Sequence, residues 1–345
     1  MDCLPFNIEI NNHITNFYLK LKNIDVNNFD INFVEDSYKK NNIEKSKYIP
    51  ETIFRFINNN KSIKTSLNIM IDKCNYTINL YFFEKDRDII KIYKNIFKII
   101  TFLSMFKKNI HKNTNYQIDI YFTNFKKEID FRNNIIDSFN VNTGLTTSYY
   151  NNFSKITIYR QEEWFKVLIH ELIHAFNFDF RENYDAFKEL KKYYDIDSDF
   201  NLNESYVEFW ARLINVIYFC EIKSINREKF DNNFKKYFKK EILHSIDSGL
   251  KILSLISIHN DNYKENSNVF AYYIITSLLI INYKNFINWC YSYNDNLINI
   301  KSDKNIIYKF VNKIIEYNKN DLSIESYLCG NIRDNSLTMT TVNIF

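Results

Sequence analysis

The sequence predicts an α+β fold in which a lobe with a mixed β-sheet and a mainly helical lobe lie on either side of a cleft. Segments whose apolar and polar residues alternate, as in strands, lie before residue 160, whereas nearly everything from residue 203 onward has helical periodicity. The chain of 345 residues has only 3 glycines and 2 prolines, which disfavours a barrel or sandwich with many tight turns. We expect a mostly helical region over 1–60, an α/β lobe over 61–180 and a helical lobe over 181–345.

The elements of the sheet lobe follow from local patterns, taken in chain order. Residues 66–71 and 76–83 each alternate, and Lys73-Cys74-Asn75 between them predicts a hairpin. The remaining elements expected before the middle of the chain are a long helix over 86–107 and strands over 117–122 and 154–159, with the segment 144–150 between these strands.

The most specific pattern is His170-Glu171-Leu172-Ile173-His174, set in an apolar run that indicates a buried helix. A helix repeats every 3.6 residues, so His170 and His174 lie on one face and can bind one metal ion. Glu171 is displaced by about 100° around the helix, so its carboxylate can reach a water on that metal without binding the metal. Histidines that stay neutral or bond to carbonyls are the alternative, but buried polar groups need partners, and a metal supplies them.

The third ligand has to come from elsewhere, because a catalytic zinc ion takes three protein ligands and keeps one position for water. The pattern H-E-x-x-H-x-x-G-x-x-H is excluded, since Asn177 and Phe180 stand where it needs glycine and histidine. Glu204 and Glu208 are four residues apart in an apolar helix, which favours one ligand and one carboxylate that orients a ligating histidine. A competing interpretation pairs Glu208 with Arg212 on a solvated face.

In its H-E-x-x-H helix and the later Asn203-Glu204 pair followed by Glu208, the chain resembles the gluzincins, zincin metallopeptidases with a glutamate as third zinc ligand. The resemblance covers residues 140–220 and implies a zincin-like fold, one Zn²⁺ ion and hydrolysis of a polypeptide substrate. It implies these roles: His170, His174 and Glu204 as ligands, Glu171 as general base and Glu208 as support of a ligating histidine. The 30 positions from His174 to Glu204 exceed the spacing of the best-known members, which leaves both Glu204 and Glu208 open as third ligand. The chain is also similar to zinc-peptidase-like proteins of large DNA viruses.

In the implied reaction, Glu171 takes a proton from the attacking water and passes it to the leaving amine. An additional donor has to stabilise the oxyanion, and Tyr272, Tyr273 and His259 are candidates because gluzincins often place a tyrosine or histidine downstream. Each of the three is also explained as an ordinary core or surface residue. Residues 144–149 are a candidate edge strand for pairing with extended substrate, or else an ordinary strand or loop.

Two other functions fit the same residues. One is a catalytically inactive scaffold that keeps its zinc, which the intact Glu171 disfavours. The other is a helical interaction protein in which the motif is accidental. That function predicts no stoichiometric metal and is disfavoured by the paired acids Glu204 and Glu208.

Composition and a few sequence patterns limit the binding partners and the cell compartment that we expect. The chain has 45 basic and 41 acidic residues, and its net charge of +4 is too small to indicate nucleic-acid binding. The longest apolar run, Val269 to Ile281, is too short to cross a bilayer and indicates a core helix. The N-terminal residues show no signal peptide, and 5 cysteines without a C-x-x-C pattern are typical of reduced thiols. We expect a cytoplasmic protein, inside a virus-infected host cell, that binds neither membrane nor nucleic acid; its oligomeric state is open.

Overall fold

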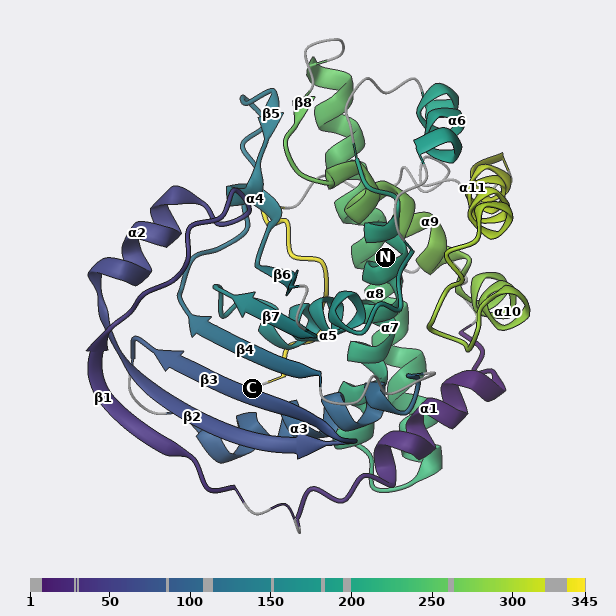
Figure 1. Cartoon of the computed structure of the whole chain (residues 1–345). Coiled ribbons are helices and arrows are strands. Elements are labelled where there is room, and N and C mark those ends of the chain that lie inside the picture. Colours follow the sequence, from purple (N-terminus) through teal and green to yellow (C-terminus); the bar gives the residue numbers. More distant parts are fainter. Residues whose placement is uncertain are drawn as a thin grey trace.

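A six-stranded mixed sheet lies on one side of the computed structural model, and most of the helices lie on the other side (Figure 1). The structure describes residues 8–344 except 28, 30, 85–86, 108–113, 150–151, 181–183, 195–199, 260–263 and 320–333. The strands in spatial order are β1 (Val34–Lys40), β2 (Lys61–Ile71), β3 (Cys74–Phe82), β4 (Asn115–Phe122), β7 (Phe153–Ile158) and β6 (Gly144–Tyr149). The expected α+β class and helical C-terminal part are therefore confirmed in the described residues.

The predicted hairpin is present as β2 and β3, which pair antiparallel up to Ile71 opposite Cys74. Its turn is shorter than expected. Asp72 and Lys73 have φ values of 52° and 63°, the left-handed conformation of a two-residue turn that preserves the strand twist. Cys74 and Asn75, expected in the turn, therefore already belong to β3.

The predicted strands over 117–122 and 154–159 are present as β4 and β7, and the segment 144–149, left open between strand and loop, forms β6. Strand β4 is parallel to both β3 and β7, and β6 is antiparallel to β7. Parallel neighbours need a crossover, and helix α3 (Ile89–Ser104) provides it between β3 and β4. Asp86 and Tyr150, at the ends of two predicted elements, lie outside the described residues.

The described part of the first 60 residues includes a strand that was not expected. Two helices, α1 (Asn12–Lys22) and α2 (Glu51–Asn59), lie in this region, and β1 between them pairs antiparallel with β2. This strand is Val-Glu-Asp-Ser-Tyr-Lys-Lys, and its polar composition suits a sheet edge. No apolar alternation marks it in the sequence.

The H-E-x-x-H helix is α5 (Trp164–Ala175), and it lies against the same face of the sheet as α3. Tyr93 of α3 is 2.9 Å from the Thr65 hydroxyl of β2, and Trp164 packs edge-on against Phe122 of β4. A smaller apolar cluster packs under α2 on the opposite face. Figure 1 shows α5 between the sheet and the helical side.

Strand β6 approaches α5 closely because it begins with glycine. A Cβ at Gly144 would lie 2.9 Å from Cγ1 of Val167 and 3.1 Å from the carbonyl oxygen of Thr157, closer than side chains normally pack. This approach places Thr146, two residues further along β6, within hydrogen-bond distance of Glu171.

The helical side is organised around α7 (Asn203–Ile222), which packs against α5. The other helices of this side are α6 (Tyr184–Tyr194), α8 (Arg227–His259), α9 (Thr276–Ile281), α10 (Tyr283–Tyr293) and α11 (Lys304–Lys319). A π-helical segment, η2 (Phe270–Ile275), leads into α9, so the predicted core helix is present in two pieces. The short elements are α4 (Ser138–Val141) and the parallel pair β5 (Ile135–Ile136) and β8 (Lys264–Glu265). None of the helices in the described ranges has both the length and the apolar character needed to cross a membrane.

Candidate metal centre

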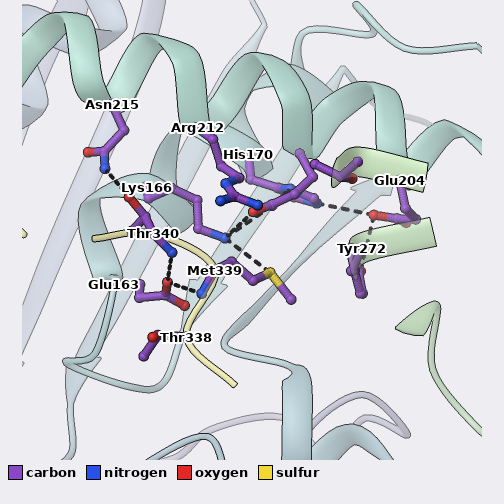
Figure 2. A network of polar contacts seen from close by, with 12 residues as sticks. Glu163, Lys166, His170, Glu204, Arg212, Asn215, Tyr272, Thr338, Met339 and Thr340 are labelled. Atoms are coloured by element: carbon purple, nitrogen blue, oxygen red, sulfur yellow. Dashed lines mark hydrogen bonds and ion pairs between the residues drawn. The ribbon is translucent and has the colours of Figure 1, made fainter. Parts of the chain in front are cut away.

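Helices α5 and α7 present matching rows of polar side chains to each other. On α5, Lys166, His170 and His174 are four residues apart and so share a face, and Glu204 and Glu208 do the same on α7. The two rows run in opposite directions. Nε2 of His170 is 3.1 Å from Glu204 (Figure 2). Nδ1 of the same ring is 3.0 Å from Glu208. His170 therefore lies between the two glutamates, one helical turn apart.

Three atoms form a nearly equilateral triangle on this face. The Nε2 atoms of His170 and His174 are 3.2 Å apart, and they lie 3.1 Å and 3.4 Å from Oε2 of Glu204. Two ligands at about 2.0–2.1 Å from one tetrahedral zinc ion are about 3.3–3.4 Å apart. The two imidazole nitrogens and the carboxylate oxygen thus fit a zinc ion in type and in spacing.

The other ring nitrogen of each histidine faces a carboxylate. Nδ1 of His170 is 3.0 Å from Glu208, and Nδ1 of His174 is 2.8 Å from Asp179. A neutral imidazole that donates from Nδ1 presents a lone pair at Nε2. The two carboxylates therefore favour the tautomer in which both Nε2 atoms can bind a cation.

Asp179 reaches His174 because the chain reverses where α5 ends. Asn177 has a left-handed φ of 53°, and its N–H and that of Phe178 donate to carbonyls of the last turn at 2.9 Å and 3.0 Å. Nδ2 of Asn203, on α7, also donates to Asp179 at 3.2 Å. Asp179 was not predicted from the sequence, since its position depends on this reversal and no periodicity marks it.

The pKa values within the triangle are strongly coupled. Burial alone would lower the pKa of both histidines, but the neighbouring carboxylates outweigh it, so the pKa of His170 is raised and that of His174 is raised well above its ordinary value. Burial would raise the pKa of Glu204, but the charge on His174 outweighs it and holds that pKa well below its ordinary value. Without a metal, the cluster therefore retains protons where a cation would bind.

The buried carboxylates around the triangle are only partly balanced by lysines. Two buried lysines each face a carboxylate of their own: Lys127 with Glu163 at 2.7 Å, and Lys166 with Glu208 at 2.9 Å. Within the described ranges, no ion pair joins Glu171 or Glu204 to a lysine or arginine. Their two negative charges are left for protonated histidines or for one divalent cation, which agrees with the donor set.

Glu171 lies beside the triangle and outside it. Its Oε2 accepts a hydrogen bond from the Thr146 hydroxyl of β6 at 2.7 Å. Burial raises the pKa of Glu171, although the nearby His170 and His174 oppose this. A carboxylate with a raised pKa, close to a metal position but not part of it, is suited to accept a proton. Thr146 was not identified in the sequence, because only the close approach of β6 brings it here.

Tyr272 reaches the cluster, whereas Tyr273 and His259 do not. The Tyr272 hydroxyl donates to Oε2 of Glu204 at 3.1 Å from the π-helical segment η2. The Tyr273 hydroxyl points elsewhere and donates to the carbonyl of Leu337 at 2.6 Å. Nε2 of His259 is 2.9 Å from the carbonyl of Phe131, at the end of α8.

Glu204, and not Glu208, belongs to the triangle. Glu208 is fully buried, and both of its oxygens face Lys166, at 2.9 Å and 3.0 Å. Burial would raise the pKa of Glu208, but the charge of Lys166 outweighs it and lowers the pKa to about 2. Arg212 pairs instead with Glu241 of α8 at 2.8 Å. The interpretation with Glu208 and Arg212 paired on a solvated face is therefore wrong, because this face of α7 is buried.

A pocket of about 610 Å³ opens over the cluster. The residues that line it include His170, Glu171 and His174, residues 144–148 of β6, and residues 265–268 at the end of β8 and in the loop after it. Leu145 is the single aliphatic side chain among the described residues that line the pocket. The cluster is thus reached from a mainly polar pocket that runs beside an edge strand.

Comparison with known proteins gives a partial similarity to a viral protein. No protein-family model and no solved structure matches the chain. A stretch of 159 residues is 28% identical to part of an uncharacterized protein of Acanthamoeba polyphaga mimivirus. The match covers 44% of this chain and 36% of the mimivirus protein, so the chain spans well under two thirds of that relative.

Proposed function

We propose that this chain is a zinc-dependent peptidase of the gluzincin type, with a zincin-like fold. The observation that carries the proposal is the triangle of donor atoms, with sides of 3.1–3.4 Å, that His170, His174 and Glu204 form beside Glu171. The H-E-x-x-H motif leads to three of these four residues, His170, Glu171 and His174, without any structural information.

His170, His174 and Glu204 would hold the ion, which when bound supplies a Lewis acid that polarises the scissile carbonyl and lowers the pKa of the attacking water. Glu171 accepts the proton from that water and transfers it to the leaving amine as the C–N bond breaks. Its raised pKa supports this role, because a weaker acid is a better proton acceptor.

Other side chains keep these groups in place. Glu208 and Asp179 fix the ring orientation of the two histidines, and Thr146 holds the Glu171 carboxylate. The Tyr272 hydroxyl lies within hydrogen-bond distance of Glu204 and is the candidate donor to the oxyanion. Tyr273 has no such role in this proposal, because its hydroxyl is bonded to the Leu337 carbonyl.

The substrate in this proposal is an extended polypeptide. Strand β6 is at the edge of the sheet and lines the pocket, so its free edge can pair with a peptide backbone. The polar lining favours small or polar side chains next to the scissile bond over bulky aliphatic ones. The setting remains the cytoplasm of an infected host cell, which the buried free thiols of Cys74, Cys220 and Cys290 support.

Zinc content and peptide hydrolysis together test the proposal in the purified wild type, His174→Ala and Glu171→Gln. We expect one zinc per chain in the wild type, loss of zinc in His174→Ala, and retained zinc with abolished hydrolysis in Glu171→Gln. Hydrolysis is measured by mass spectrometry on a proteome-derived peptide library. Full zinc content in His174→Ala would exclude the ligand assignment. Zinc in the wild type without any cleavage would favour the inactive scaffold.

A further inference from the structure

We propose that Lys166 is a positioning residue of the metal centre: it clamps Glu208 as the partner of His170 and thereby keeps that carboxylate off the metal. The inference rests on the proposed zinc site and deepens it. It explains why Glu204 and Glu208, one helical turn apart on α7, have different roles. The residue that separates these roles, Lys166, is not part of the H-E-x-x-H motif.

The contacts of Lys166 account for all three of its N–H donors. The ammonium is 2.9 Å and 3.0 Å from the two oxygens of Glu208 and 3.4 Å from the sulfur of Met339 (Figure 2). Only 2% of the lysine side chain and none of the Glu208 side chain is exposed. The ion pair is therefore enclosed, and water does not compete for it.

The C-terminal segment closes the space around Lys166. Glu163 accepts hydrogen bonds from the backbone N–H groups of Met339 and Thr340, and Lys127 balances its charge. Nδ2 of Asn215, on α7, donates to the Thr340 hydroxyl at 3.3 Å. Figure 2 shows this segment beside Lys166, on the side away from Glu204. The ammonium is therefore held on the Glu208 side of the cluster.

The clamp determines what each oxygen of Glu208 can do. Oε1 faces Lys166, and Oε2 faces both Lys166 and Nδ1 of His170 at 3.0 Å. Glu208 is thus held at Nδ1 of His170, whereas the triangle lies at Nε2 of the same ring, so Glu204 is the carboxylate that completes the triangle. If the lysine is removed, the buried carboxylate loses its paired counter-charge and shifts to find another partner. Nδ1 of His170 then loses its fixed acceptor, and the ligand loses its orientation.

The test is a double-mutant cycle on zinc affinity, measured by competition with a chelator, with Lys166→Met, Glu208→Gln and the double variant. Loss of a group that supports a ligand typically costs about 10–100-fold in metal affinity, and we expect this for each single variant. Because Lys166 acts through Glu208, the double variant should bind zinc within about twofold of Glu208→Gln alone. The absorption spectrum of bound Co²⁺ should change in Lys166→Met, since the ligand geometry changes.

Lys98→Met is the matched control. Lys98 forms a nearly buried ion pair with Glu221, also on α7, at 2.6 Å, but neither residue contacts the metal cluster. This variant should lower the thermal stability of the metal-free protein and leave zinc affinity within about twofold of wild type. Lys166→Met, in contrast, should lower the zinc affinity and change the absorption spectrum of bound Co²⁺.

Wild-type zinc affinity in Lys166→Met would overturn the inference, and so would losses that multiply in the double variant. If Lys166→Met does not fold, the comparison of Glu208→Gln with the double variant still decides, because the double variant has no unpaired buried charge. A wild type that binds zinc but cleaves no peptide would sink the peptidase proposal and leave this inference standing.

Discussion

The hydroxyl of Thr146 donates to the carboxylate of Glu171 at 2.7 Å and so joins the edge strand of the sheet to the proposed general base. The same hydroxyl lies 3.0 Å from the backbone carbonyl of Glu171. In the proposed mechanism, β6 binds the substrate and also holds Glu171. This contact therefore positions Glu171 relative to both the scissile bond and the metal.

Replacing Thr146 with valine keeps the side-chain volume and removes this hydrogen bond. A hydrogen bond to a charged group contributes about 1.5–3 kcal/mol, so we expect kcat/KM to fall by about 10–100-fold with full zinc content. Peptide cleavage kinetics and zinc analysis measure the two effects. Thr65→Val is the control, since its hydroxyl is hydrogen-bonded to Tyr93 of α3, away from the cluster. Loss of zinc in Thr146→Val would contradict the assigned role.

Tyr272 and Tyr273 form a natural pair for testing the oxyanion donor. Tyr272→Phe should keep its zinc and lose about 10²–10³-fold in kcat, because removal of one oxyanion donor has that effect in other hydrolases. Tyr273→Phe should keep the wild-type kcat, since its hydroxyl bonds to Leu337 away from the pocket. Equal kcat for wild type and Tyr272→Phe would remove Tyr272 from the mechanism.

Asp179 should affect the zinc affinity although it is not one of the three proposed ligands. Asp179→Asn weakens the partner of His174 Nδ1, and the expected cost is about 10–100-fold in zinc affinity. Asp231→Asn is a suitable control, because Asp231 forms a partly exposed ion pair with Arg227 far from the cluster. An unchanged zinc affinity in Asp179→Asn would show that His174 is oriented by other contacts.

The pH dependence of stability should differ between the metal-free and zinc-bound protein. The folded-state pKa values of His170 and His174 are raised, so their stabilising contribution is fully present below the unfolded value of about 6.5 and is lost as the pH rises through the folded values. The Tm of the metal-free protein should therefore fall as the pH rises above about 6.5. Zinc should raise the Tm more in this pH range than at lower pH, because fewer protons compete with zinc for the histidines.

Calorimetry of both forms across this range measures the effect. His174→Gln should flatten the metal-free dependence, because it removes the group with the larger shift. A metal-free Tm that falls equally in wild type and His174→Gln would show that other groups control it.

Local patterns predict much of this fold. The alternation on either side of Asp72 and Lys73 is enough to identify the β2–β3 hairpin, because strand periodicity and turn length are local properties. The spacing of His170 and His174 likewise predicts their shared face. The polar edge strand β1 is different: its place in the sheet comes from pairing with β2, and no pattern of its own shows it.

In the candidate site, too, local spacing predicts some residues, whereas others are placed only by tertiary contacts. The two candidate histidine ligands are visible in the sequence because helical spacing alone places His170 and His174 on one face. The choice of Glu204 over Glu208 is not visible there, because it depends on how α7 packs against α5. Asp179 and Thr146 are not visible, since a chain reversal after α5 and the contact of β6 with α5 place them. Sequence also does not separate Tyr272 from Tyr273, because the choice depends on which way the η2 segment faces.

The central claim is that His170, His174 and Glu204 hold one zinc ion. The most direct measurement is a crystal structure of the purified protein with anomalous data collected on both sides of the zinc absorption edge. The account predicts one zinc peak per chain, about 2.0–2.2 Å from Nε2 of each histidine and from a carboxylate oxygen of Glu204. No zinc peak at this triangle, or a peak bound by Glu208 in place of Glu204, would contradict it.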